Sequence, residues 1–232
     1  MGWGNGGTAD MRFGVATAPP ESYHCRSMAA KLAALVERAA AGLGATLDEH
    51  ALTAVLTWLQ RLQEWNSRMD LTAARSPEEL VDLMLADALV LSAHIPPGAR
   101  LVDVGAGAGA PGLGLALVRE DLRVTLVEPR GKRASFLRTV LGATGRADVA
   151  VERARGEALA GRRAWDVAVS RATLSPPRWL ELGTTLAAPG GSVWVLLAKE
   201  PPPVHPRAEI DGDYGYSWPL TGAIRRAVCY RV

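Results

Sequence analysis

Residues 101–112 read Leu-Val-Asp-Val-Gly-Ala-Gly-Ala-Gly-Ala-Pro-Gly, and this stretch decides the fold. An apolar run precedes the glycines, as in a buried strand, and residues 113–118 after them are typical of a helix. Glycine is needed where the chain turns sharply and where a ligand must approach main-chain N–H groups with no Cβ in the way. The stretch therefore predicts a strand, a tight ligand-binding turn and the start of a helix.

A second apolar run, residues 123–127, ends at Glu128. An acidic side chain about 20 residues past such glycines suits the hydroxyl pair of a ribose. Together the two strands predict a site for a nucleoside cofactor at the carboxyl edge of a parallel sheet.

The position of Asp103 favours one cofactor over the others. Residues 107–112 fit the pattern Gly-x-Gly-x-x-Gly, which NAD or FAD sites also show, and a purely structural glycine turn is a further reading. Asp103 stands two residues before Gly105, where a carboxylate would repel a pyrophosphate and suit the ammonium of a methionine moiety. We therefore expect S-adenosylmethionine, bound by Asp103, Gly105, Gly107, Gly109 and Glu128.

Composition bounds the class of protein. The chain has 232 residues, 48% of them hydrophobic, which is enough for one sizeable α/β domain with an appendage. Its net charge is +2, too small to indicate a nucleic-acid partner by itself, although residues 119–178 hold 13 Lys and Arg against 7 Asp and Glu. Cys25 and Cys229 lie far apart, so we expect a cytosolic protein without a metal site, and no run is long enough for a membrane span.

Strands and helices are expected to alternate along most of the chain. Residues 1–27 lack periodicity and are expected to be a disordered tail, residues 28–97 a helical region, and residues 98–232 a methyltransferase domain. Further strands are expected at residues 149–152, 165–169 and 192–198, helices at 28–41, 49–66, 77–91, 131–143 and 176–186, and a hairpin at 213–232. This order predicts a doubly wound, Rossmann-like and mostly parallel sheet with an antiparallel C-terminal hairpin.

Several short motifs, in this order, carry a resemblance to a known family. They are Leu-Gln-Glu-Trp-Asn at 62–66, Leu71-Thr72, Pro77-Glu78-Glu79, Asp87, the glycine motif at 103–112, Gly131-Lys132-Arg133, Phe136-Leu137, Ser170-Arg171-Ala172 and Lys199. Over roughly residues 50–200 the chain resembles the ribosomal RNA small-subunit methyltransferase G family, also called glucose-inhibited division protein B.

The resemblance implies a reaction and a set of contacts. It implies S-adenosylmethionine-dependent methylation of a guanine N7 in 16S rRNA, in the cytoplasm, on a seven-stranded sheet behind N-terminal helices. The substrate would be 16S rRNA or the small ribosomal subunit, and we expect a monomer that does not bind membranes. Carried onto this chain, the cofactor contacts are Gly105, Ala110, Gly156, Glu157 and Arg171, with Glu128 on the ribose.

The chain departs from the family pattern at several positions. Leu83-Met84 replace Arg-His, Asp70 replaces Asn, Ala110 replaces a larger apolar residue, and Glu200 replaces Gly. The departures at 70, 83–84 and 200 remove positive charge or add negative charge where RNA would lie. They leave two rival functions open, a small-molecule methyltransferase and a non-catalytic cofactor-binding scaffold.

The implied reaction explains why no general base stands near the glycines. Guanine N7 carries a lone pair and no proton, so it can attack a sulfonium methyl directly, and catalysis rests on positioning. Arg171 is our candidate catalytic residue, because it follows a strand at the ligand-binding edge of such sheets. We expect its side chain to protrude there, and to contribute to turnover more than to stability.

Overall fold

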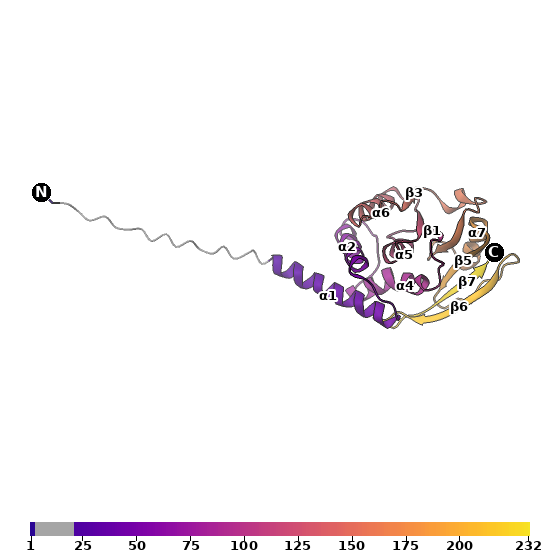
Figure 1. Ribbon diagram of the computed structural model, residues 1–232, viewed down its shortest axis with the longest axis horizontal. Coiled ribbons are helices and arrows are strands. Elements are labelled where there is room, and N and C mark those ends of the chain that lie inside the picture. Colours follow the sequence, from indigo (N-terminus) through magenta and orange to yellow (C-terminus); the bar gives the residue numbers. More distant parts are fainter. Residues whose placement is uncertain (3–20) are drawn as a thin grey trace.

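The computed structural model of this chain describes residues 1–2 and 21–232. Its centre is one seven-stranded sheet with the order β3-β2-β1-β4-β5-β7-β6 (Figure 1). The strands are β1 (Arg100–Val104), β2 (Arg123–Val127), β3 (Ala150–Glu152), β4 (Trp165–Ser170), β5 (Ala187–Leu197), β6 (Glu209–Ser217) and β7 (Ile224–Arg231). The first five strands are parallel, and β7 runs antiparallel to both β5 and β6. The expected mostly parallel sheet with an antiparallel C-terminal hairpin is confirmed.

The strand order creates a crevice beside β1. From β1 the chain first builds outward through β2 to β3, and it then returns to place β4 on the other side of β1. Connections that leave two neighbouring strands in opposite directions open a crevice at their carboxyl ends, where ligands bind in open α/β sheets. The glycine turn follows β1 at this point, as the sequence indicated.

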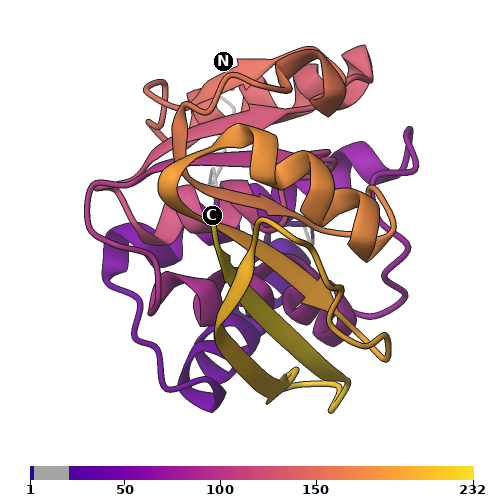
Figure 2. The same ribbon diagram turned by 90° about the vertical axis from the view of Figure 1, so that its right-hand side faces the viewer.

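Helices cover both faces of the sheet, and the side-chain alternation of the strands explains how. Along β4, Val167 and Val169 pack into one buried cluster with the N-terminal helices, while Ala168 between them packs into a second cluster. The second cluster lies beneath α7 (Pro176–Leu186) and includes its Trp179 and Leu180. Figure 2 shows α7 in orange in front of the sheet and the purple helices behind it. The doubly wound arrangement is therefore confirmed.

The N-terminal helices pack directly on the sheet. They are α1 (Glu21–Gly42), α2 (Glu49–Asn66), α3 (Pro77–Val81), η1 (Asp82–Ala86) and α4 (Asp87–Ser92). Two further helices, α5 (Gly112–Val118) and α6 (Gly131–Ala143), follow β1 and β2 in the chain. Their apolar faces join β1 and β2 in one buried cluster. None of the helices in the described part of the chain is both long and apolar enough to cross a membrane.

The first helix begins earlier than its sequence suggested. The sequence suggested a helix from Met28, whereas the backbone is helical from Glu21. The rest of the predicted disordered tail falls on residues 3–20, outside the described residues. The division of the chain at residues 27 and 97 stays a prediction.

The helix expected at residues 77–91 contains an unexpected π-helical turn. Ser76 caps its start by accepting a hydrogen bond from the Glu79 N–H, as its sequence indicated. The π turn, η1, then widens the helix between Asp82 and Asp87. Because a π turn is wider than an α turn, it brings residues five apart toward the same face. Both aspartates are buried and both contact the C-terminal hairpin.

The hairpin is longer than its sequence suggested. It was expected to start near residue 213, but β6 begins at Glu209. The Asp82 carboxylate accepts hydrogen bonds from the N–H groups of Leu220 and Thr221, in the β6–β7 turn. Pro219 of this turn packs against Gly42 at the end of α1, and Figure 1 shows the two segments side by side.

Trp58 links the N-terminal helices to the glycine turn. It lies in α2, is completely buried, and its indole N–H donates to the carbonyl oxygen of Ala108 at 2.9 Å. An unpaired buried carbonyl costs about 1–3 kcal/mol, so this hydrogen bond fixes the turn against α2.

Replacing Trp58 with phenylalanine is expected to weaken both the fold and the turn. We expect a loss of about 1–3 kcal/mol in the free energy of unfolding, together with weaker cofactor binding. Trp179→Phe is the matched control, because Trp179 is also buried and donates to a main-chain carbonyl, that of Trp194, on the other face of the sheet. Denaturant unfolding and calorimetry check both variants. Equal cofactor affinity in the two would contradict the assigned role of Trp58.

Candidate active site

The glycine turn connects β1 to α5 through residues with positive φ. Gly105, Gly107 and Gly109 have φ angles of 75°, 56° and 113°. Side chains other than glycine rarely adopt these angles, which explains the spacing of the motif. The N–H groups of Gly105 and Ala106 both donate to the Val127 carbonyl and so tie the turn to the end of β2.

The three glycines meet different surroundings. A Cβ at Gly105 would collide with the side chain of Thr173, and one at Gly109 would lie 2.7 Å from a Leu113 methyl carbon. A Cβ at Gly107 would meet nothing closer than 3.7 Å. A side chain would therefore clash at the first two positions, whereas at Gly107 its Cβ would make only ordinary van der Waals contacts. The cofactor contacts of Gly105, Gly107 and Gly109 stay predictions.

Asp103 lies beneath the turn rather than at its open edge. Its side chain is completely buried, and Oδ2 accepts a hydrogen bond from the Gly112 N–H at 2.8 Å. Among the described residues, Oδ1 has no hydrogen-bond partner. Burial raises the pKa of this carboxyl to about 7, although the Gly112 N–H and the charge of Arg171 oppose that rise. A buried acceptor without a donor is what an incoming ammonium group would satisfy.

Glu128 joins the turn to the start of α6. It is 3% exposed, and its Oε2 accepts from the Gly107 N–H at 3.0 Å while Oε1 accepts from the Arg130 N–H at 2.8 Å. Each carboxylate oxygen keeps a further lone pair for a ribose hydroxyl. The expected ribose contact stays a prediction, and the structure adds that Glu128 also shapes the glycine turn.

The remaining expected contacts occupy three different environments. Gly156 is buried at the start of η2 (Gly156–Leu159), and a Cβ there would press on Val104 at the end of β1. Glu157 beside it is exposed. Ala110 is 6% exposed and belongs to the buried cluster under the N-terminal helices. Gly156 therefore lies against the end of β1, whereas cofactor contacts by Ala110 and Glu157 stay predictions.

Arg171 does not protrude, contrary to the expectation from its sequence position. Its side chain is only 18% exposed and forms a salt bridge with Asp87 at 3.1 Å. The same guanidinium group donates to the main-chain carbonyl of Leu83. Two helical residues thus hold Arg171 across the end of β4, because the N-terminal helices pack over this edge of the sheet.

Asp87 accepts from three donors, which come from the end of β4 and from the C-terminal hairpin. Its Oδ2 pairs with Arg171, and its Oδ1 accepts from the Tyr216 hydroxyl at 2.8 Å and from the Trp218 indole N–H at 3.1 Å. Burial and the Asp87 carboxylate raise the pKa of Tyr216, so this hydroxyl remains a donor. The sequence did not indicate Tyr216 and Trp218, because about 130 residues separate them from Asp87 along the chain.

A cavity of about 610 Å³ opens beside this network, at the carboxyl ends of β4 and β5. Its lining includes Arg171, Ala172, Leu196, Trp218 and Arg225. Ala172 has a φ of 54°, a strained angle for alanine, and Thr173 after it lies with its hydroxyl oxygen 3.4 Å from the Gly105 carbonyl oxygen. The cavity therefore adjoins the glycine turn through residues 171–173.

The departures from the family pattern fall in different places. Leu83 and Glu200 line the cavity, whereas Met84 is 3% exposed and packs in the core. The Asp70 carbonyl accepts a hydrogen bond from Arg133 of α6 at 3.2 Å. Leu83 and Glu200 are thus the departures that change the cavity wall.

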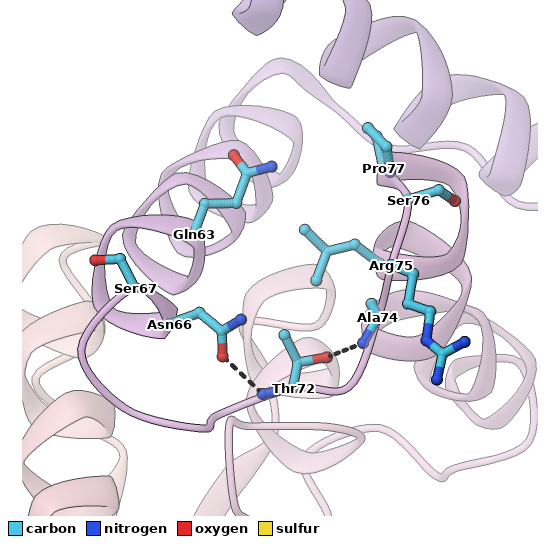
Figure 3. Close-up of a pocket in the computed structure, with 9 residues that line it drawn as sticks. Gln63, Asn66, Ser67, Thr72, Ala74, Arg75, Ser76 and Pro77 are labelled. Carbon is cyan, nitrogen blue, oxygen red and sulfur yellow. Dashed lines mark hydrogen bonds between the residues drawn. The ribbon is translucent and has the colours of Figure 1, made fainter.

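The Trp-Asn and Leu-Thr motifs build a loop beside a second, smaller cavity. The Asn66 side-chain oxygen accepts from the N–H groups of Leu71 and Thr72, and the Thr72 hydroxyl accepts from the Ala74 N–H. Figure 3 shows this loop around a cavity of about 350 Å³, with Gln63 and Ser67 on the α2 side. These motifs therefore fix the connection between α2 and α3, which is a structural role.

Cofactor binding is expected to strengthen as the pH rises through about 7. An ammonium group pairs with the ionised form of Asp103, and burial keeps that carboxyl protonated below its raised pKa. The same carboxyl binds its proton more tightly in the folded than in the unfolded chain. Its contribution to the free energy of unfolding is therefore lost as the pH rises from about 4 to about 7. Calorimetric titration from pH 5.5 to 7.5 measures the binding effect.

Asp103→Asn is the control for this pH dependence. The amide keeps an acceptor for the Gly112 N–H but does not titrate. We expect its cofactor affinity to be weaker at pH 7.5 and its pH profile to be flatter. A profile as steep as that of the native protein would show that another group titrates.

Comparisons with known proteins agree with this geometry. The sequence pattern of the family described as rRNA small subunit methyltransferase G matches residues 51–202. A ribosomal RNA small subunit methyltransferase G from Xanthomonas axonopodis pv. citri is 39% identical over 79% of this chain and 83% of its own length. One from Anaeromyxobacter dehalogenans is 37% identical over 68% of this chain and 74% of its own.

Solved structures are more distantly similar. The match to the crystal structure of P. horikoshii TYW2 in complex with MeSAdo has a TM-score of 0.49 and 14% sequence identity. It covers 63% of this chain and 62% of the TYW2 chain. The fold assignment here rests on the strand order of this chain.

Proposed function

The chain belongs to the rRNA small subunit methyltransferase G family, and we propose that it methylates N7 of a guanine in 16S rRNA. S-adenosylmethionine is the methyl donor. The observation that carries the proposal is the pair of acidic side chains at the glycine turn: among the described residues Oδ1 of the buried Asp103 has no hydrogen-bond partner, and the Glu128 carboxylate accepts from the Gly107 N–H. We further propose that the protein acts in the cytoplasm, as a monomer, on the RNA of the small ribosomal subunit.

The residues at the turn fit each part of this cofactor. Asp103 offers a buried acceptor to the ammonium group, and Glu128 offers lone pairs to the ribose hydroxyls. Gly107 leaves room for the ligand to pass. Gly156, packed against the end of β1, leaves this edge of the sheet free of a further side chain.

The reaction needs positioning more than proton transfer. When bound, the cofactor supplies a methyl group on a positively charged sulfur. Because guanine N7 has no proton, no residue of the chain has to act as a base. Arg171 is held at the end of β4 by Asp87 and Leu83, between the glycine turn and the cavity. It therefore positions cofactor or substrate, and Asp87 acts through it.

The decisive experiment maps N7-methylguanosine in small-subunit rRNA from cells with and without this gene. Purified protein is then tested on small subunits and on protein-free rRNA from the strain that lacks the modification. We expect the mark to disappear with the gene and to return with the protein. Binding to rRNA should weaken as salt rises, since phosphate contacts release counterions.

The rival functions give different results in the same experiments. A small-molecule methyltransferase would bind the cofactor and leave the rRNA unmodified. A non-catalytic scaffold would bind the cofactor without any transfer, and a protein without cofactor binding would overturn all three readings. The small-molecule function is included in this test because Leu83 and Glu200, two departures from the family pattern, line the cavity.

A further inference from the structure

Arg225 and Trp218 form a flat, charged surface at the large cavity. The guanidinium carbon of Arg225 lies 3.9 Å from the centre of the Trp218 ring, and both residues line the cavity. Trp218 is itself fixed, because its indole N–H donates to the buried Asp87 carboxylate. A guanidinium group laid on a fixed aromatic ring is pre-organised, so little side-chain entropy is lost when it binds a ligand.

The two arginines of the cavity differ in what they already bind. The guanidinium group of Arg171 is paired with Asp87 and with the Leu83 carbonyl. Arg225 donates through one nitrogen to its own neighbour, the Ile224 carbonyl, and has no salt-bridge partner among the described residues. A guanidinium group has five N–H donors, so most of those on Arg225 remain for an anion. Within the described part of the chain, Arg225 is therefore the cation of the cavity that has donors left for a phosphate.

The cavity also has a place and a lining that suit a nucleobase. Its β4 side adjoins the glycine turn through Ala172 and Thr173, and its β5 side carries Leu196 and the Glu200 carboxylate. Bases removed from their stack are bound against apolar or planar groups and read on their Watson–Crick edge. The N1 and N2 groups of guanine can donate hydrogen bonds to a carboxylate, and N7 lies on the opposite edge of the base.

We propose that this cavity receives the extruded target nucleotide, with its base between Leu196 and the β4 end and its phosphate bound by Arg225. The inference rests on the proposed rRNA methylation and identifies where the substrate enters. It assigns Arg225 as a substrate-binding residue. It also explains why Asp87 holds both Arg171 and Trp218, since one carboxylate then aligns the two sides of the cavity.

Arg225→Ala and Arg226→Ala form a matched pair that tests the phosphate contact. Both arginines lie on β7 and both changes remove one charge, but Arg226 is paired with Asp213. For Arg225→Ala we expect the KM for small-subunit RNA to rise about 10- to 100-fold, with little change in cofactor affinity. The slope of log KM against log salt should fall by about one unit. Arg225→Lys should recover only part of the loss, because lysine cannot form the bidentate contact.

Ala198→Phe tests the base position separately. Ala198 is exposed at the end of β5 and lines the cavity, so a phenyl ring there should occupy the space of the base without straining the core. We expect methyl transfer to fall by more than about 10-fold while cofactor affinity is kept. Normal transfer by this variant would overturn the placement of the base.

Each outcome separates this inference from the proposed function. If the native protein methylates rRNA and the two arginine variants behave alike, the inference is wrong and the function stands. Arg225→Ala could also lose methyl transfer only because it is less stable, with a lower melting temperature and an unchanged slope of log KM against log salt. That result would give Arg225 a structural role and would also overturn the inference. A native protein that leaves rRNA unmodified would overturn the proposed function, and the inference with it.

Discussion

Replacing Gly107 with valine is expected to abolish binding of S-adenosylmethionine while the chain remains folded. A Cβ at this position would meet no protein atom closer than 3.7 Å, so the cost to the fold is mainly the backbone strain of a φ of 56°. The side chain would stand at the residue whose N–H donates to Oε2 of Glu128, the expected ribose contact. Intrusion of this kind costs about 1–3 kcal/mol, and the lost approach to the backbone adds to it, so affinity should fall about 100-fold or more.

Two other glycines provide the controls for this experiment. Gly98 also has a positive φ, of 69°, with nothing within 4 Å of a Cβ, but it precedes β1 at the far edge of the sheet. Gly98→Val should therefore show the backbone strain, about 1–2 kcal/mol, without loss of binding. Gly109→Ala should instead destabilise the fold, since its Cβ would press on Leu113 and Trp58. Calorimetry and thermal melting distinguish the three variants, and native affinity in Gly107→Val would remove the cofactor assignment from this turn.

Replacing Arg171 with alanine is expected to reduce both turnover and stability. The salt bridge to Asp87 is mostly buried, with side-chain exposures of 18% and 3%. Removing one partner of a buried pair costs about 3–5 kcal/mol, and Asp87 keeps its two donors from the hairpin, so we expect about 2–3 kcal/mol here. Loss of a group that stabilises the transition state would lower the rate of methyl transfer by about 30- to 1000-fold.

A second change separates the two effects of Arg171. Asp87→Asn removes the charge that Arg171→Ala leaves unpaired, so the double variant should regain part of the stability. Its methyl transfer should stay low, because the guanidinium group is still missing. Arg171→Lys should rescue transfer only in part, since the shorter lysine keeps the charge but not the planar guanidinium group whose Nη1 contacts both Asp87 and Leu83. Transfer that returned to normal in the double variant would assign Arg171 a structural role alone.

Local sequence determined the sheet and its helices. The strand from Arg100 to Val104, the helix from Gly131 to Ala143 and the helix from Pro176 to Leu186 were expected at these positions. These elements can be predicted from the sequence because apolar periodicity, glycine turns and N-terminal prolines act over a few residues. The start of β6 was missed, because an exposed edge strand carries little apolar alternation.

The π turn at Asp82–Ala86 shows why a helix could be predicted but not its irregularity. The local pattern from Ser76 onward indicates a helix of uniform pitch. The wider turn lets Asp82 bind the hairpin turn while Asp87 binds Tyr216 and Arg171. These partners lie far away in the sequence, and the energy that selects the turn comes from contacts that form only in the folded chain.

The sequence by itself determined the cofactor class, through the order of Asp103, the glycines and Glu128. Only the tertiary structure decided what each residue does. It separated Gly107, where a Cβ would meet only ordinary contacts, from Gly105 and Gly109, where a Cβ would clash. It also placed Arg171 inside a network, and laid Arg225 on the Trp218 ring at the cavity with no salt-bridge partner among residues 1–2 and 21–232. The physical reason is that composition and spacing fix local conformation, whereas burial, pairing and free space depend on neighbours that the chain brings together across the whole sheet.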